Sequence, residues 1–316
     1  MASLLDDFAE PFVAVEAADA VGALAEHWGI EARDLARLDT ERDDTFRAET
    51  ATGAVVLKIA HPTDPPELID LQSRAMEHAH AADPGIPLQS IVPTTDGGLS
   101  VLVNGRVARV LTWLDGDLML SHPPSIGQLT SLGRMLGRLN RALAGFEHPA
   151  SDRELIWDLP RLPAMRPYTD DPYLLGVIDR YADEVVPRLD ALPHQIVHND
   201  IHPGNVLVDP ADRDRVVGIL DFGDTLRTAR ACDLGVAIAY LLPDVDDIWP
   251  SVDAIVGAFE AEVPLLEEER ALIPDLVSAR LVMRNLIAAA TGGARNSESP
   301  FFDRNLRSIH RILETR

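Results

Sequence analysis

The pattern of apolar residues changes near residue 115, and this change limits the folds open to the chain. Before it, two stretches have the composition of strands, at residues 35–59 and 92–113. Turns are predicted within them at Thr52-Gly53, Asp96-Gly97-Gly98 and Asn104-Gly105. After it, the apolar residues follow helical spacing, at residues 125–146, 171–192 and 252–316. Strands followed by helices, in a chain of 316 residues, predict an α+β fold with two lobes.

The lobe boundary is predicted just before Gly116. We expect a small, β-rich N-lobe at residues 1–115 and a larger, mainly helical C-lobe at residues 116–316. Two shorter helices are predicted in the N-lobe, at residues 19–28 and 67–82. In the C-lobe, the long helix at residues 125–146 carries a leucine stripe, and Ser125 is a suitable N-cap.

The composition excludes several classes of partner and location. The formal net charge is −23, which disfavours nucleic acid and anionic membranes as partners. The sequence has no run of about 18 apolar residues, so we expect no transmembrane helix. The first ten residues carry acidic but no basic side chains, unlike a secretory signal. Because Cys232 is the only cysteine, no intramolecular disulfide can form, and we expect a cytoplasmic location.

Lys58 is the only lysine of the chain. Lysine and arginine together number 28, so arginine occupies every other basic position. A position that keeps lysine against this bias indicates a need for a compact ammonium group rather than a planar guanidinium. Lys58 lies in the β-rich segment 54–59, from which a lysine can reach the phosphates of a nucleotide. The alternative is a surface lysine whose charge lies in solvent.

The chemical groups of interest lie between Gln195 and Asp224. A short β segment leads into the polar loop His-Asn-Asp-Ile-His-Pro-Gly-Asn at residues 198–205, and Asp221 ends the next β segment. Phosphoryl transfer requires cations against the phosphates, hard oxygen ligands for Mg²⁺ and a carboxylate that orients the attacking hydroxyl. Asn205 and Asp221 supply oxygen ligands of this kind, and Asp200 can accept the hydroxyl proton.

This motif resembles that of a known superfamily. His198-Asn-Asp200 with Asn205, followed by Asp221-Phe-Gly223, is similar to a kinase catalytic loop and metal-binding motif. The form His-x-Asp-x-His-Pro-x-Asn is similar to the aminoglycoside phosphotransferase and choline kinase superfamily, and it differs from the His-Arg-Asp loop of protein kinases. Residues 41–46 and 218–224 resemble the hydroxylysine-kinase-like branch. The resemblance implies the bilobal protein-kinase-like fold and ATP- and Mg²⁺-dependent phosphorylation of a hydroxyl group on a small molecule.

The resemblance also implies roles for individual residues. Asp200 would be the catalytic carboxylate, with Asn205 and Asp221 as the metal ligands. Lys58 would bind the nucleotide phosphates. Adenine would meet backbone groups of the strand that links the lobes, at Leu111, Trp113 and Leu114.

Four neighbouring residues have a supporting role or a packing role. His198 would brace the loop, and His202 would either face the substrate or pack. Asp224 would either touch the metal or stabilise its loop. Asp233, just before an apolar helix, would cap that helix or brace a loop.

Two departures from the kinase pattern concern the N-lobe. Residues 38–50 contain no glycine, whereas protein kinases cover the phosphates with a glycine-rich loop. The helix after Lys58 should also offer it a glutamate. The family register points near Gln72, with Glu67 and Glu77 as the other candidates, and the sequence does not choose among them.

The substrate is expected to carry an amine. The acidic residues Asp244, Asp246, Asp247 and Asp253 would receive that amine or form a solvated face. Arg280, Arg284 and Asn285, on a helix at residues 273–291, could bind a substrate carboxylate. An amino acid such as hydroxylysine would use both charges, whereas an aminoglycoside would ignore the arginines.

Three functional hypotheses follow. The first is a kinase of an amino acid or amino alcohol, with an aminoglycoside or other antibiotic as the alternative acceptor; homoserine, choline and thiosugar are further candidates. The second is a nucleotide-binding pseudokinase that acts as a partner-binding module, against which the complete set of Lys58, Asp200, Asn205 and Asp221 argues. The third is a protein kinase, which the absence of an Ala-Pro-Glu element after Asp221 disfavours.

Overall fold

The computed structural model describes residues 12–40, 42–120, 124–242, 247–290 and 300–314. Its contacts group the chain into two compact units. We call them the sheet unit, Glu10–Asp115 with Gly218–Leu220, and the helical unit, Gly116–Val217 with Asp221–Arg316. The predicted α+β chain with a strand-rich first part is confirmed. Within the described ranges, none of the helices combines the length and the apolar character that a membrane span requires.

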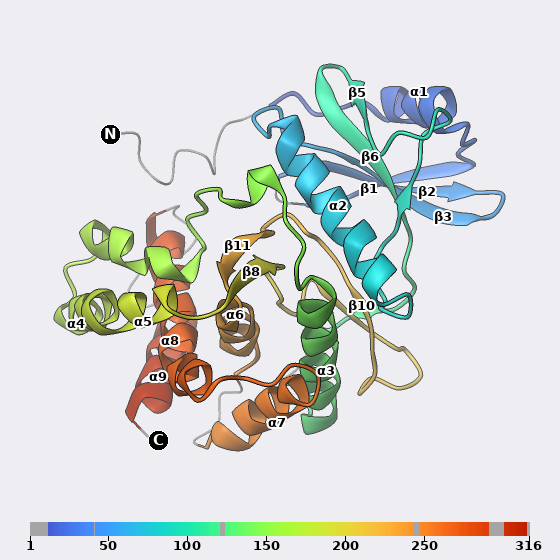
Figure 1. Ribbon diagram of the computed structural model, residues 1–316. Coiled ribbons are helices and arrows are strands. Elements are labelled where there is room, and N and C mark those ends of the chain that lie inside the picture. The colour runs from blue at the N-terminus through green and yellow to red at the C-terminus, as the bar shows by residue number, and fades with distance from the viewer. Residues whose placement is uncertain (1–11, 41, 121–123, 243–246, 291–299, 315–316) are drawn as a thin grey trace. The chain divides into compact units, whose positions relative to one another are not determined.

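An antiparallel sheet with two helices makes up the sheet unit (Figure 1). The strand order is β1-β2-β3-β6-β4, and β5 also pairs with β6. The strands are β1 (Asp34–Leu38), β2 (Asp44–Thr50), β3 (Gly53–Ile59), β4 (Ile91–Val92), β5 (Val101–Val103) and β6 (Arg106–Thr112). The helices are α1 (Ala17–Trp28) and α2 (Pro66–Ala82).

The predicted turns connect neighbouring strands of this sheet. Gly53, the first residue of β3 after the turn from β2, has a φ of 128°, which a residue with a side chain rarely adopts. Asn104 and Gly105, between β5 and β6, have φ values of 53° and 78°. Positive φ at both central residues is what a two-residue hairpin of type I′ requires. Thus short-range turn chemistry accounts for these two connections.

The core of the sheet unit lies between the sheet and α1. Leu24 and Trp28 of α1 pack in one cluster with Phe46 of β2 and with Leu57 and Ile59 of β3. Successive side chains of a strand point to opposite faces. Lys58, between two core residues, therefore points to the other face of the sheet, and its side chain is 12% exposed.

The helical unit contains the remaining helices and two small sheets. The helices are α3 (Ile126–Ala142), α4 (Pro172–Arg180), α5 (Val186–Asp190), α6 (Ala231–Leu241), α7 (Trp249–Glu260), α8 (Glu267–Ala290) and α9 (Pro300–Glu314). The strands are β7 (Asp117–Leu118), β8 (His194–Val197), β9 (Val206–Val208), β10 (Val216–Ile219) and β11 (Leu226–Ala229), of which β10 has its last two residues in the sheet unit. One sheet has the order β10-β9-β7, and the other pairs β11 with β8.

Helix α3 packs tightly against α7. Its N-terminus has a capping box, in which Ser125 and Gln128 exchange hydrogen bonds between side chain and backbone, so the predicted cap is confirmed. Glycine on the buried face lets the two backbones approach closely: a Cβ added to Gly133 would lie 2.3 Å from the carbonyl oxygen of Ile255. The predicted leucine stripe is buried at this interface and in the adjoining core.

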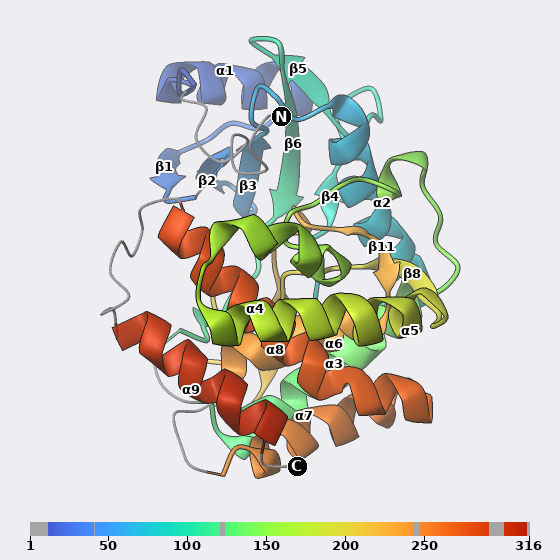
Figure 2. The same ribbon diagram turned by 90° about the vertical axis from the view of Figure 1, so that its left-hand side faces the viewer.

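Helices α6 and α8 lie side by side, and α9 lies along α8 (Figures 1 and 2). A Cβ added to Gly235 of α6 would lie 2.5 Å from the Cβ atom of Leu276 on α8. This glycine therefore permits the close packing of α6 on α8. The same pair of helices supplies Tyr240 and Arg280, which meet near the polar loop.

The predicted helix at residues 171–192 is not a regular α-helix along its whole length. It consists of α4, a π-helical turn at Tyr181–Val185 and the short helix α5. Pro187 has no amide hydrogen to donate, and its ring would clash with the carbonyl four residues earlier in a regular α-helix. The π turn is a known way to accommodate such a local break.

Candidate active site

The polar loop at residues 198–205 connects β8 to β9, and residues of α6 hold its first part. Asn199 has a φ of 65° although it is not glycine, and its amide nitrogen donates to Asp233 Oδ1 at 2.8 Å. Asp233 is fully buried in the first turn of α6, which begins at Ala231, earlier than the sequence suggested. His198 is also fully buried, with its ring 4.9 Å from that of Phe222. The loop is thus fixed by buried groups around it.

Asp200 accepts hydrogen bonds from side chains on both sides of the loop. Arg280 Nη2 lies 3.0 Å from Oδ1, and Asn205 Nδ2 lies 3.0 Å from Oδ2. His202 Nε2 lies 3.4 Å from Oδ2. Burial acts to raise the pKa of Asp200, but the hydrogen bond from His202 and the charge of Arg280 outweigh it and lower that pKa. Asp200 is therefore a carboxylate at neutral pH.

Arg280 is almost completely buried, with 1% of its surface exposed. It donates to the carbonyl oxygen of Trp157 at 3.0 Å and to the hydroxyl of Tyr240 at 3.2 Å, besides Asp200. Asn285 is also buried and accepts from Asn305 Nδ2 at 2.7 Å. The burial of both side chains and the hydrogen bonds that they form inside the fold argue against the expectation that Arg280 and Asn285 bind a substrate carboxylate.

Arg284 occupies a more open position than Arg280. Its guanidinium carbon lies 4.1 Å from the centre of the Tyr240 ring, a cation–π distance. The His202 ring lies 5.2 Å from the same tyrosine ring. Burial lowers the pKa of Arg284, and the charges of Arg280 and Arg304 lower it further. An anion next to this group of arginines would be stabilised.

Asn205 and Asp221 supply oxygen atoms of the kind that Mg²⁺ prefers. Asn205 donates through its amide nitrogen to Asp200, which orients its amide oxygen away from that carboxylate. Asp221 has a φ of 59°, and its Oδ1 accepts from the amide nitrogen of Gly223 at 3.0 Å. The described residues contain no cluster of three or more acidic, His or Cys groups suited to a metal. Two protein ligands fit Mg²⁺ bound with nucleotide phosphates and water.

Asp224 has an environment that favours its neutral form. Burial and the negative charge of Asp200 raise the pKa of Asp224 to about 7, although Arg280 and Arg153 oppose this shift. Its side chain is still 25% exposed, and the guanidinium of Arg153 lies 4.0 Å away. A cationic group bound next to Asp224 would therefore stabilise its ionised form.

In the sheet unit, Lys58 forms an ion pair that the sequence did not predict. Its Nζ lies 3.3 Å from Asp43 Oδ2, in the connection between β1 and β2. Gln72, one of the three candidate partners, accepts instead from the buried Arg109. Of the other two, Glu77 pairs with Arg74, and Glu67 is exposed. Asp43 can pair with Lys58 because the acidic residues that precede β2 are also within reach of β3.

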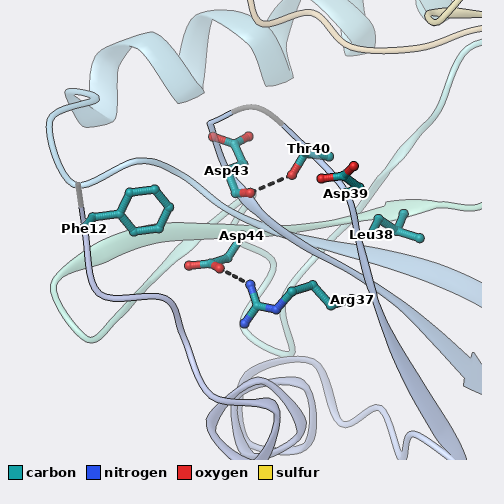
Figure 3. Close-up of a pocket in the computed structure, with 7 residues that line it drawn as sticks. All are labelled: Phe12, Arg37, Leu38, Asp39, Thr40, Asp43 and Asp44. Carbon is teal, nitrogen blue, oxygen red and sulfur yellow. Dashed lines mark hydrogen bonds and ion pairs between the residues drawn. The ribbon is translucent and has the colours of Figure 1, made fainter. Parts of the chain in front are cut away.

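The hollow beside this hairpin has a volume of about 390 Å³ and is drawn in Figure 3. It is lined by Phe12, Arg37, Leu38, Asp39, Thr40, Asp43 and Asp44. Asp44 is buried and forms ion pairs with Arg37 and Arg106. Burial acts to raise the pKa of Asp44, but hydrogen bonds from a backbone amide and from the two arginines outweigh it and lower that pKa. With three carboxylates and one guanidinium, the lining is unsuited to phosphate.

The predicted adenine-binding residues lie at the end of β6. Leu111 is within the sheet, where it pairs with Val56 on one side and Ile91 on the other. The ladder ends at Thr112, so Trp113 and Leu114 are the first residues of the linking segment. The Trp113 ring is covered by the guanidinium of Arg47 at 4.5 Å. The end of the ladder favours Trp113 and Leu114 over Leu111 as donors or acceptors for a ligand.

The acidic residues proposed to receive an amine fall into two groups. Asp247 and Asp253 are exposed on and before α7. Asp244 and Asp246 lie outside the described residues. Exposure of the first two agrees with a solvated face.

Comparisons with known proteins agree with the sequence motif. The family model described as the phosphotransferase enzyme family matches residues 34–272. Hydroxylysine kinase of Danio rerio is 28% identical, over 84% of this chain and 81% of that protein. Homoserine kinase of Methylobacillus glycogenes is 28% identical, over 72% of this chain and 70% of that protein.

A solved structure supports the fold assignment. The amicoumacin kinase in complex with AMP-PNP, Ca²⁺ and Ami superposes with a TM-score of 0.72 at 15% identity, over 94% of this chain and 93% of that chain. The predicted kinase-like fold is therefore confirmed. The family match covers most of the chain, including the polar loop and Asp221. The chain therefore belongs to the phosphotransferase enzyme family, as a kinase of a small molecule.

Proposed function

We propose that the protein transfers the γ-phosphoryl group of ATP, bound with Mg²⁺, to a hydroxyl group of a small amino acid. The observation that carries this proposal is the state of Asp200. It is ionised and partly exposed, and three side chains hold it in one orientation. A carboxylate of this kind can align an acceptor hydroxyl for attack on phosphorus.

Asp200 would act as the positioning base of the transfer. The acceptor oxygen forms a bond to the γ-phosphorus, and the bond from that phosphorus to the bridging oxygen of ADP breaks. The hydroxyl proton passes to Asp200 as the new bond forms. Two relatives are named as kinases of hydroxylysine and homoserine. The residue roles proposed here rest on the chemistry of this loop alone.

The charges against the phosphates would come from two sources. Asn205 and Asp221 would hold Mg²⁺, which supplies charge neutralisation on the transferring group when bound. Lys58 would provide a compact cation for the phosphates, in agreement with its retention as the only lysine.

The acceptor class is proposed from the charges near Asp200. Arg284 offers a cation suited to a carboxylate: burial and the neighbouring arginines lower its pKa, and a substrate carboxylate next to it would oppose this shift. Asp224 offers a carboxyl group that a substrate ammonium would ionise. An α-amino acid with a hydroxyl group presents both charges, and hydroxylysine and homoserine are such compounds. An aminoglycoside would engage Asp224 but have no use for Arg284.

The experiment screens purified protein with ATP and Mg²⁺ against separate pools of hydroxylated amino acids, amino alcohols and aminoglycosides, and measures ADP release. We expect turnover with the amino-acid pool. Turnover with aminoglycosides alone would refute the acceptor class, and nucleotide binding without turnover in any pool would favour the pseudokinase.

The carboxylate contact has its own test in Arg284→Glu. This variant should raise the KM for the amino-acid acceptor at least tenfold, because an attraction becomes a repulsion. Arg270→Glu on the same helix, which removes only a surface ion pair with Glu260, serves as the control for a charge reversal. An unchanged KM in Arg284→Glu would remove Arg284 from the binding site.

A further inference from the structure

Arg280 lies in the interior of the helical unit, next to Asp200. Only 1% of its surface is exposed. A buried charge of this kind is costly unless it is paired and hydrogen-bonded. Its partner is the proposed catalytic carboxylate, 80 residues earlier in the chain.

The other contacts of Arg280 fix the direction of its guanidinium. One nitrogen donates to the carbonyl oxygen of Trp157 at 3.0 Å, and the nitrogen that contacts Asp200 also donates to the Tyr240 hydroxyl at 3.2 Å. The rings of Trp157 and Tyr240 lie 5.1 and 5.3 Å from the guanidinium carbon. Since a guanidinium is planar and rigid, anchoring it at the Trp157 carbonyl and the Tyr240 hydroxyl determines where Asp200 Oδ1 lies.

The carboxylate of Asp200 can accept one more hydrogen bond, which the reaction requires for the acceptor hydroxyl. A carboxylate accepts about four hydrogen bonds. Within the described part of the chain, Arg280 occupies one position on Oδ1, while Asn205 and His202 address Oδ2. The second position on Oδ1 is then the one left for an acceptor hydroxyl, and its direction depends on Arg280.

We propose that Arg280 is a positioning residue, which orients Asp200 for phosphoryl transfer and touches neither nucleotide nor acceptor. This inference rests on the proposed function, because it assigns Asp200 the role of the base. Arg280 acts through geometry: a misplacement of about 1 Å at a reacting group can cost on the order of 100-fold in rate.

The test replaces Arg280 by lysine, which keeps the charge and loses the planar set of donors. Arg280→Lys should lower kcat about 10- to 100-fold, with the KM for ATP within about twofold of wild type. Combined with Asp200→Asn, it should cause no further loss, because Arg280 acts only through that carboxylate. Arg270→Lys, on the exposed face of the same helix, should leave both constants unchanged.

Tyr240→Phe provides a second variant, in case Arg280→Lys does not fold. It keeps the ring and removes the hydroxyl that anchors the guanidinium, so kcat should fall less than in Arg280→Lys, again without a change in the KM for ATP. Unchanged kcat in the folded variants would overturn the inference and leave the proposed function intact. Wild-type protein without turnover in any pool would overturn the proposed function, and the role of Arg280 with it.

Discussion

Asp158 lies just before the 3₁₀ helix Leu159–Tyr168 and next to Thr228, within the helical unit. Burial raises the pKa of Asp158 to about 6, although the hydrogen bond with Thr228 and the charges of Arg161 and His194 oppose the shift. Within the described residues its Oδ1 is buried without a hydrogen-bond partner. We predict that Asp158→Asn, which keeps the shape and removes the charge, stabilises the protein relative to wild type as the pH rises.

The magnitude follows from the difference between the folded and unfolded pKa values. The folded value is about 6 and the ordinary value is 3.8. For a carboxyl group with a raised pKa, stability is fully present below the unfolded pKa and is lost as the pH rises through the folded pKa. Relative to low pH, the raised pKa of Asp158 should lower the free energy of unfolding of wild type by about 2 kcal/mol at pH 5 and by about 3 kcal/mol at pH 7. The asparagine variant does not bear this cost.

Urea unfolding of both proteins at pH 5 and pH 7 measures the effect. Any cost of the amide that does not change with pH cancels in the comparison. The free energy of unfolding of the variant should therefore rise by about 1 kcal/mol relative to wild type between the two pH values. Asp190→Asn, at an exposed position at the end of α5, controls for the exchange of residue type. A difference between variant and wild type that stays constant or shrinks as the pH rises would refute the reasoning.

Two further predictions concern the loop and the helix packing. Asp200→Asn should lower kcat at least 100-fold, because the amide cannot accept the hydroxyl proton. Nucleotide binding, measured by calorimetry, should stay within a few-fold of wild type. Full activity of this variant would exclude Asp200 as the base. Gly133→Ala should destabilise the protein by about 1–3 kcal/mol in thermal unfolding, because its Cβ would meet the carbonyl oxygen of Ile255. Gly257→Ala on α7, where an added Cβ has no neighbour within 4 Å, is the matched control, and an equal loss in both variants would contradict the steric argument.

The features that were predicted from sequence are those that depend on nearby residues. The cap at Ser125 and the turns at Gly53 and Gly105 are encoded within a few positions, and they are observed where expected. The catalytic motif is also short, since Asp200 and Asn205 lie on one loop. Lys58 was singled out by composition, because a single lysine among arginines is conspicuous in the sequence itself.

The features that were missed depend on tertiary contacts. The partner of Lys58 at Asp43 requires the register of β2 against β3, in which Thr45 lies opposite Lys58. Arg280 was expected to bind a substrate carboxylate, although its neighbours at residues 273–283 are mostly apolar, which favours burial. The π turn before Pro187 was hidden because the apolar spacing continues through it.

The support of the polar loop comes from parts of the chain that are synthesised after it. Asp233 on α6 holds the left-handed conformation at Asn199, and Arg280 on α8 holds the carboxylate of Asp200. A nascent chain that ends before Glu267 already contains the whole motif but neither α8 nor its guanidinium. Catalytic competence should therefore appear late in biosynthesis, and transplanting residues 198–205 alone into another scaffold should not transfer it.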